Sequence, residues 1–269
     1  MKERLDILLV NNGFSESRDK AKRIVMSGKV FVDGQLADKA GTKYDIDSDI
    51  LVKGDPCPYV GRGGLKLEKA INTFDLNLEE LLCVDMGAST GGFTDCMLQH
   101  GAKKVYSIDV GYGQLAYKLR VDNRVVNIEK TNIRYLNRSL IKEPVDFISI
   151  DVSFISTKHM FPVCKDILKE DGKVVSLIKP QFEAGREEVG KGGIVKSQKT
   201  HIDVIKKVIN YAKEQDLNLQ GITFSPIKGT KGNIEYLSYF EKNKEPITNY
   251  EEEIINLVEI SHDNLNNIT

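Results

Sequence analysis

Residues 81–94 read LLCVDMGASTGGFT, an apolar run followed by a glycine-rich turn. This pattern is typical of a buried strand that leads into a helix, where backbone N–H groups at the helix start bind nucleotide-like ligands. A Walker-type phosphate loop would need lysine at the position of Phe93. The dinucleotide fingerprint G-x-G-x-x-G would need glycine at the position of Ser89. The turn therefore favours a nucleotide-like ligand of another kind.

The sequence around this turn alternates strand-like and helix-like segments. Helical periodicity is clearest at 62–74, 93–101, 158–171 and 198–215. Strands are predicted at 81–85, 104–109, 125–128, 145–151, 172–179, 219–225 and 233–240. The alternation predicts the α/β class, here a Rossmann-like domain over residues 62–241 with a mostly parallel, doubly wound sheet. The polar tail at 242–269 is predicted to add a helix over 250–265.

The first 54 residues have a different pattern, which predicts a small α+β domain at 1–54. Three leucines spaced as one helical face predict a first helix, which Asn12-Gly13 would end. Either Ser15 or Ser17 is positioned to cap a second helix. The domain would thus begin with two helices.

Short strands and a linker are predicted next. The stretch KVFVDGQLA (29–37) alternates around an Asp-Gly turn, which is a hairpin signal, and SDILVKGD (48–55) offers one more strand. Residues 54–61 read GDPCPYVG, and their prolines and glycines disfavour both helix and central strand. We therefore expect a linker of limited flexibility at 55–61.

The charge of the chain is balanced overall but uneven locally. A formal net charge of −1 predicts no global attraction to RNA or to a membrane. Between residues 17 and 29, however, Asp19 is the only acid among five cations: Arg18, Lys20, Lys22, Arg23 and Lys29. Such a stripe can lie on phosphates, although a solvated helix face is an equally good explanation of the charges alone.

Cysteine spacing and hydropathy argue against a metal-binding protein and a membrane protein. The four cysteines, at positions 57, 83, 96 and 164, form no C-x-x-C pair and no finger spacing with the four histidines, so no metal site is predicted. The apolar run at 7–10 is too short for a signal-peptide core, and no run approaches the length that spans a bilayer. We expect a cytoplasmic protein without a membrane partner.

Polar residues at the predicted strand ends indicate the ligand. Asp109 ends the second strand and is expected to accept hydrogen bonds from ribose hydroxyls, with a helix cap as the alternative. Asp85 is either structural or in contact with the ligand. Asn132 follows the third predicted strand, at the place where S-adenosylmethionine-binding folds contact adenine. A ribose acid and a glycine turn without the dinucleotide fingerprint are the pattern of S-adenosylmethionine enzymes. The predicted cofactor residues are Asp85, Gly87, Ala88, Ser89, Thr90, Gly91, Gly92, Phe93, Asp109, Asn132 and Asp151.

Charged residues at neighbouring strand ends are candidates for catalysis. Asp151 and Lys179 end adjacent predicted strands, and Glu235 lies on the last strand. For any one of these residues a surface salt bridge is the simpler explanation. Several charged groups that converge on one cleft, together with Lys66 near the linker, favour a functional site.

Longer motifs identify a family resemblance. RLDILL (4–9), SRDKAKRIVMSGKV (17–30) and VDG (32–34) resemble the S4 RNA-binding domain. In the larger domain, six motifs are similar to those of the TlyA (hemolysin A) family, which are S4-plus-FtsJ-like ribosomal RNA 2′-O-methyltransferases: GRGGLKL (61–67), DMGASTGGFT (85–94), DVGYGQLA (109–116), DVSFIS (151–156), KPQFE (179–183) and GNIEY (232–236).

The resemblance implies a function and a set of roles. It implies S-adenosylmethionine-dependent methylation of cytidine in ribosomal RNA of the large subunit and, as a second candidate, of the small one. The family's Lys-Asp-Lys-Glu tetrad would fall on Lys66, Asp151, Lys179 and Glu235; spacing alone does not prefer Lys66 to Lys69. Lys179 would act as general base or orient the hydroxyl, Asp151 would orient Lys179 and face the sulfonium, and the other two would fix the ribose and Lys179.

Some features stay open at this point. Family members have a basic–aromatic linker ending in Trp-Val, where this chain has Cys57-Pro58-Tyr59-Val60. Whether this altered linker couples RNA docking to cofactor binding therefore stays an open question. The glycine-rich stretch 182–197 is either a phosphate-facing lid or a plain surface loop. The alternative functions are a non-catalytic ribosome-binding factor, a nicotinamide-dependent oxidoreductase and a membrane-damaging protein. The sequence indicates neither the oligomeric state nor whether the substrate is naked RNA or an assembled subunit.

Overall fold

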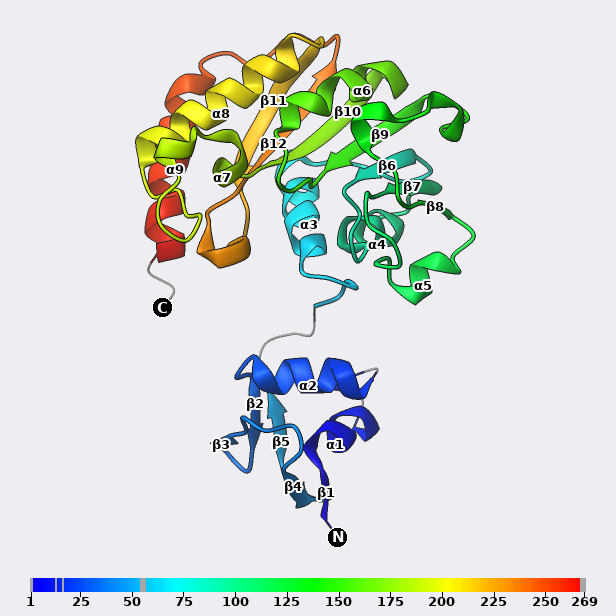
Figure 1. Cartoon of the computed structure of the whole chain (residues 1–269), viewed down its shortest axis with the longest axis vertical. Helices are drawn as coiled ribbons and strands as arrows, with labels where there is room; N and C mark the ends of the chain where they lie inside the picture. Colours follow the sequence, from blue (N-terminus) through cyan, green and yellow to red (C-terminus); the bar gives the residue numbers. More distant parts are fainter. Residues whose placement is uncertain (1, 13, 16, 54–56, 267–269) are drawn as a thin grey trace. The chain divides into compact units, whose positions relative to one another are not determined.

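The chain forms two compact units, Met1–Pro58 and Tyr59–Thr269, which are described separately below (Figure 1). The computed structural model describes residues 2–12, 14–15, 17–53 and 57–266. The boundary between the units falls within the segment that the sequence predicted to be a linker.

Two short helices build the apolar core of the N-terminal unit, α1 (Leu5–Asn11) and α2 (Arg18–Met26). Leucines of α1 pack against Ala21 and Val25 of α2 in one buried cluster. The side chain of Ser17 caps α2 by accepting a hydrogen bond from a backbone N–H of the first turn, which decides between the two candidate caps. Asn12 ends α1 as predicted, whereas Gly13 lies outside the described residues.

Small sheets complete this unit. The predicted hairpin joins β2 (Val30–Val32) to β3 (Gln35–Leu36) through Asp33 and Gly34, both at positive φ, as a two-residue hairpin turn requires. The other edge of β2 pairs with β5, the predicted late strand at Ile50–Val52. The sequence prediction missed one antiparallel pair, whose two charged three-residue strands carry no apolar alternation: β1 (Lys2–Arg4) and β4 (Lys43–Asp45).

A seven-stranded sheet organises the C-terminal unit, and all of its strands were predicted. Its order is β11-β12-β10-β9-β6-β7-β8, with the neighbouring pairs from β10 to β8 parallel and β12 antiparallel to both of its neighbours. Their bounds are β6 (Leu82–Met86), β7 (Lys104–Ile108), β8 (Val125–Ile128), β9 (Val145–Ile150), β10 (Leu168–Ile178), β11 (Leu217–Phe224) and β12 (Tyr236–Lys242).

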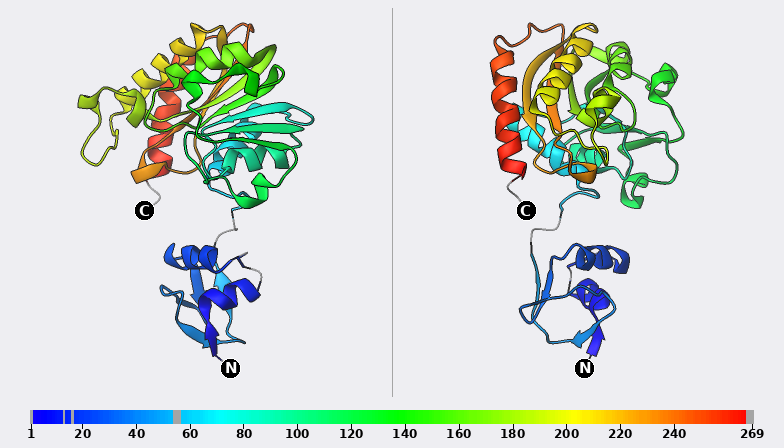
Figure 2. Two further views of the ribbon diagram at one scale, coloured as in Figure 1. Left: turned by 45° about the vertical axis from the view of Figure 1, so that its right-hand side comes forward. Right: turned by 60° about the vertical axis from the view of Figure 1, so that its left-hand side comes forward.

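Helices cover both faces of this sheet (Figure 2). Within these layers α3 packs against α4, and α8 packs against α9. The described helices of the unit are α3 (Gly63–Phe74), α4 (Gly92–Gln99), α5 (Tyr117–Arg120), α6 (Phe161–Ile167), α7 (Pro180–Glu183), α8 (Gln198–Lys213) and α9 (Tyr250–Asn266). The layers confirm the predicted doubly wound α/β architecture.

One helix prediction was wrong at its carboxyl end. The sequence predicted a helix over 158–171, but α6 ends at Ile167, and Leu168 begins β10. The buried Leu168 pairs with Val145 of β9, and an irregular stretch follows before the regular ladder resumes at Lys173. Pairing across the sheet therefore overrides the helical pattern of these four residues.

Candidate active site

The predicted catalytic residues converge at one edge of the sheet. Asp151 directly follows β9, and Lys179 directly follows the adjacent parallel strand β10. Because β12 runs antiparallel, its amino end reaches the same edge, and Glu235 directly precedes it. Lys66 enters from the first turn of α3. All four line one pocket of about 260 Å³ within the C-terminal unit.

The four charges form two ion pairs. Lys179 Nζ lies 2.5 Å from Asp151 Oδ1, and Lys66 Nζ lies 2.5 Å from Glu235 Oε2. Both lysines are only 8% exposed, and Glu235 is 2% exposed. Buried charges need partners of opposite sign, which each pair supplies across two different elements. The sequence expectation that Glu235 would also fix Lys179 is not seen as a direct contact among the described residues.

Ser153, which the sequence analysis did not assign to the site, contacts the Lys179–Asp151 pair. Ser153 Oγ accepts a hydrogen bond from Lys179 Nζ at 2.9 Å and lines the pocket. Its position two residues after Asp151, in the same loop beyond β9, was the available signal. The Lys179 ammonium is thus held between a carboxylate and a hydroxyl.

The glycine turn forms the wall next to these charges. Gly87 follows β6 at φ 93°, and a Cβ there would lie 2.6 Å from the Asp151 carbonyl oxygen, so a larger residue would separate the two strand ends. Gly91 also has positive φ and precedes the first turn of α4, whose N–H groups point toward the turn. Six predicted cofactor residues of this turn line the pocket: Gly87, Ala88, Ser89, Thr90, Gly92 and Phe93.

A second glycine cluster lies opposite the turn. Gly61 and Gly63 line the pocket where α3 begins, and a Cβ on Gly92 would lie 2.9 Å from the Gly64 nitrogen. The starts of α3 and α4 are therefore in backbone contact. Sequence reasoning used this glycine cluster only as a family motif. The pocket residues that it did not assign to the site are Gly61, Arg62, Gly63, Ser153, Ile227, Lys228 and Gly229.

Asp85 lies behind the glycine turn rather than at the pocket surface. Its carboxylate is fully buried and accepts hydrogen bonds from Thr94 N at 2.9 Å, Thr94 Oγ1 at 2.7 Å and Ser149 Oγ at 3.3 Å. Burial raises the pKa of this carboxyl to about 7, against these hydrogen bonds. Of the two roles left open for Asp85, the structural one accounts for all of these contacts.

Three other predicted cofactor residues, Gly91, Asp109 and Asn132, also lie outside the pocket lining. Half-buried Asp109 accepts hydrogen bonds from Ser89 N at 2.8 Å and Gly111 N at 2.7 Å, so it braces the glycine turn from the next strand. A carboxylate has lone pairs beyond these two bonds. Asn132 is exposed and caps a short 3₁₀ turn by accepting from Arg134 N.

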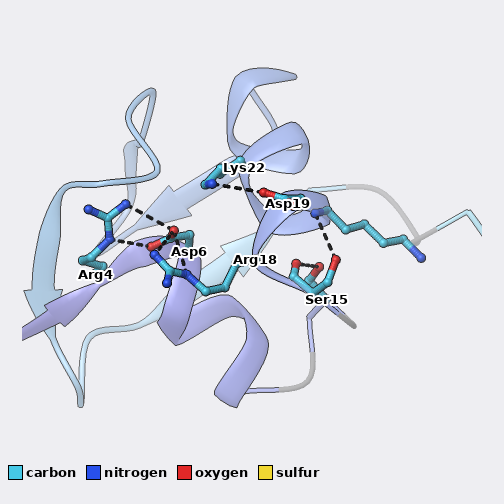
Figure 3. A network of polar contacts seen from close by, with 8 residues as sticks. Arg4, Asp6, Ser15, Arg18, Asp19 and Lys22 are labelled. Carbon is cyan, nitrogen blue, oxygen red and sulfur yellow. Dashed lines mark hydrogen bonds and ion pairs between the residues drawn. The ribbon is translucent and has the colours of Figure 1, made fainter.

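The basic helix of the N-terminal unit is partly engaged in ion pairs (Figure 3). Arg18 and Arg4 each donate to the carboxylate of Asp6, which is fully buried. The hydrogen bond from Arg4 is the main cause that lowers the pKa of Asp6 to about 2. Lys22 Nζ lies 3.0 Å from Asp19 Oδ1.

Other members of the stripe differ in exposure. Arg23 and Lys29 are exposed, whereas Lys20 is half-buried. Within the predicted RNA-binding set, Arg18 and Lys22 therefore bind acids of the unit, while Arg23 and Lys29 are exposed.

The part of the chain that the structure describes contains neither a cluster of metal ligands nor a membrane-spanning helix. Within 2–12, 14–15, 17–53 and 57–266, no group of three or more His, Cys, Asp or Glu side chains is placed to hold a metal ion. Over the same ranges, no helix has the length and apolar character needed to span a bilayer.

Comparison with known proteins shows the family. The model of the FtsJ-like methyltransferases matches residues 59–242, and the S4 domain model matches residues 3–50. This chain belongs to the FtsJ-like methyltransferase family. The S4 match and the two compact units agree with the architecture that the sequence predicted.

Several relatives of this FtsJ-like chain span nearly its whole length. YqxC of Bacillus subtilis is 48% identical over 98% of this chain and 95% of its own. The 16S/23S rRNA (cytidine-2′-O)-methyltransferase TlyA of Mycobacterium tuberculosis is 39% identical over 87% of each chain. A solved structure from Streptococcus thermophilus is 45% identical, with a TM-score of 0.79 over 98% of this chain and 97% of that one.

Proposed function

We propose that this chain is an S-adenosylmethionine-dependent ribosomal RNA ribose 2′-O-methyltransferase. The observation that carries the proposal is the convergence of the pairs Lys179–Asp151 and Lys66–Glu235 on a pocket walled by the glycine turn. The similarity to the Mycobacterium TlyA supports cytidine as the target, in RNA of the large subunit and, as a second substrate, of the small subunit. Such a substrate would place the enzyme in the cytoplasm with the ribosomes.

The geometry of the glycine turn fits the proposed cofactor. A Cβ at Gly87 would collide with the Asp151 carbonyl oxygen, so glycine there keeps the turn close to the strand end that carries Asp151. The pocket-lining residues of the turn would hold the cofactor, and Asp109, which already fixes Ser89, would offer its remaining lone pairs to the ribose. When bound, S-adenosylmethionine supplies an electrophilic methyl group on a positively charged sulfur.

Lys179 would act on the nucleophile. A ribose 2′-hydroxyl attacks poorly while it holds its proton, so the protein must orient the hydroxyl and provide a path for that proton. The pocket would hold the 2′-oxygen in line with the methyl group that the cofactor supplies, and the hydroxyl proton would pass to a neutral Lys179 or to solvent. As an ammonium held by Asp151 and Ser153, Lys179 can orient the hydroxyl; to act as a base it must first lose a proton.

The second ion pair would fix the sugar. Lys66 and Glu235 reach the pocket from α3 and from the start of β12, and the loop at Gly229 packs against the carboxylate of Glu235. Recognition of the ribose by such groups would select RNA over DNA, because only RNA offers the 2′-hydroxyl. The S4 unit would supply docking to ribosomal RNA through its solvent-facing cations.

Transfer of labelled methyl groups from S-adenosylmethionine to purified 30S and 50S subunits tests the proposal. We expect incorporation that maps to an alkali-resistant 2′-O-methylated nucleotide and is lost in Lys179→Ala. A matched control is Lys206→Ala, because Lys206 also pairs with an acid, Glu251, but is remote from the pocket lining. Tight binding to the subunits without any methyl transfer would instead support a non-catalytic ribosome-binding factor.

A further inference from the structure

The loops that follow β9 and β10 are linked at three successive places. Nearest the strands, Lys179 contacts Asp151 and Ser153, as described above. Farther along, the rings of Phe154 and Phe182 lie 5.0 Å apart between centroids. Beyond the rings, the side chain of Glu183 is bonded to the segment after Phe154. The two loops that carry the reacting pair are thus connected on both sides of the aromatic contact.

Glu183 makes the outermost of these links. Its carboxylate is 4% exposed and accepts hydrogen bonds from Ser156 Oγ at 2.6 Å, Thr157 N at 2.7 Å and Thr157 Oγ1 at 2.8 Å. All three donors belong to the loop beyond β9, while Glu183 itself ends α7 beyond β10. Burial of a carboxylate is unfavourable unless hydrogen bonds satisfy it, and these neutral donors do so.

The backbone of Glu183 is also held by a hydrogen bond. Its carbonyl oxygen accepts a hydrogen bond from Lys207 Nζ of α8 at 2.8 Å. The acid is therefore fixed to a long helix of the sheet layer on one side and to the loop of Asp151 on the other. A link with such an anchor can hold one loop against the other.

The loop that Glu183 holds contains a strained residue. Phe154 has a φ of 63° and is 90% exposed, a conformation that a residue with a large side chain adopts rarely. Such backbone strain persists only where the surroundings enforce it. Ser153, bonded to Lys179, lies before Phe154, and the Glu183 contacts lie after it. The strained turn is held from both ends.

We infer that Glu183 is a positioning residue for methyl transfer. It would not touch the substrate; it would set the distance between the loop of Asp151 and Ser153 and the loop of Lys179. The inference rests on the proposed function and deepens it. Without this link the strained loop can relax, and a shift of about 1 Å at a reacting group can lower a rate by about 100-fold.

Glu183→Gln tests the inference with little change in shape. The variant keeps one acceptor oxygen but turns an NH₂ group toward donors that need an acceptor. We expect kcat for methyl transfer to ribosomal subunits to fall by about 10- to 100-fold, with a nearly unchanged dissociation constant for S-adenosylmethionine. Thr157→Val, which removes one hydroxyl donor and keeps the backbone N–H, should lower kcat less.

Glu188→Gln is the matched control, because Glu188 is an exposed acid of the same loop that bonds only to Gly185 N and Thr200 Oγ1 among its described contacts. It should leave kcat within about twofold of the parent. A Glu183→Gln enzyme with parental kcat would overturn the inference, and so would a parallel loss of kcat, cofactor binding and melting temperature, since that pattern reports folding alone.

A crystal structure of Glu183→Gln separates this inference from the proposed function. We expect a longer distance from Lys179 Nζ to Asp151 Oδ1 than the 2.5 Å of the parent. If the parent transfers no methyl group to either subunit, the proposed function fails. The distance from Lys179 Nζ to Asp151 Oδ1 then still shows whether Glu183 positions these two residues. An unchanged distance would refute that role whatever the activity.

Discussion

The two units of this chain combine opposite charges in different ways. In the pocket of the C-terminal unit, both lysines of the two pairs are buried, as is Glu235, and the side chain of Asp151 is 20% exposed. In the N-terminal unit, only the acid Asp6 is buried, while the side chains of Arg4 and Arg18 are 39% and 54% exposed. A pair whose two charges are mostly shielded from solvent can act on a substrate enclosed with it. A buried acid with exposed cations instead orders positive charge at a surface.

The comparison predicts its largest effect at Lys179. Replacing it with alanine removes the group that orients or deprotonates the nucleophile, so methyl transfer should fall by about 10²- to 10⁴-fold. Binding of S-adenosylmethionine, measured by calorimetry, should stay nearly the same because the glycine turn is intact. Equal turnover in Lys179→Ala and Lys206→Ala would remove the catalytic distinction between the pocket pair and a pair outside the pocket lining.

A second prediction separates stability from chemistry in the other pair. Lys66→Met leaves the 2% exposed carboxylate of Glu235 without its cation, which should lower the free energy of unfolding by about 3–5 kcal/mol. In the double variant Lys66→Met/Glu235→Gln no charge is left unpaired, so much of that stability should return while methyl transfer stays low. Urea denaturation followed by far-UV circular dichroism measures the difference. Full activity in the double variant would show that the pair is only structural.

The surface cations of the N-terminal unit should affect docking rather than turnover. Arg23→Gln/Lys29→Gln removes two exposed charges, so the dissociation constant for ribosomal subunits should rise by about tenfold, and the slope of log affinity against log salt should decrease by about 1.5. Lys22→Gln is the control, because Lys22 is already paired with Asp19. Filter binding over a salt series gives both quantities. An unchanged slope in the double variant would assign docking to other residues.

The site residues could be predicted from the sequence best where the strand pattern of the chain is clear. Asp151 and Lys179 could be placed together because the ends of adjacent parallel strands meet at one edge. Glu235 needed the direction of β12, which the apolar pattern of a strand does not encode. Lys66 could not be separated from Lys69 by spacing, yet only Lys66 lines the described pocket and forms a contact with a residue 169 positions away.

The features that could not be predicted from the sequence depend on contacts between residues far apart in the chain. The β1–β4 pair has no local apolar signal, and its partners, such as Lys2 and Asp45, lie far apart in the sequence. Asp85 and Asp109 both follow the pattern of ligand-binding acids, but their oxygens bond to Thr94 and to Ser89. A carboxylate at a strand end can serve the turn or the ligand, and composition does not distinguish these uses.

The smallest predicted effects contrast two acids of the N-terminal unit. Because arginine bonds lower the pKa of Asp6 to about 2, its folded pKa lies below the unfolded value of about 3.9. Asp6 therefore contributes stability above pH 4, and this contribution is lost as the pH falls toward 2. Asp6→Asn should lower the melting temperature of the N-terminal unit by on the order of 5 °C at pH 7 and by little near pH 2.

Asp19→Asn serves as the comparison for that measurement, since the Asp19–Lys22 pair is exposed and should shift the melting temperature by less than about 2 °C at either pH. Calorimetry of the full-length variants, with the unit followed by its own transition, tests both values. Equal shifts for the two variants would mean that burial of the acid adds nothing. A large shift for Asp6→Asn alone would show that the unit is held together by the same buried carboxylate that orders Arg4 and Arg18 at its surface.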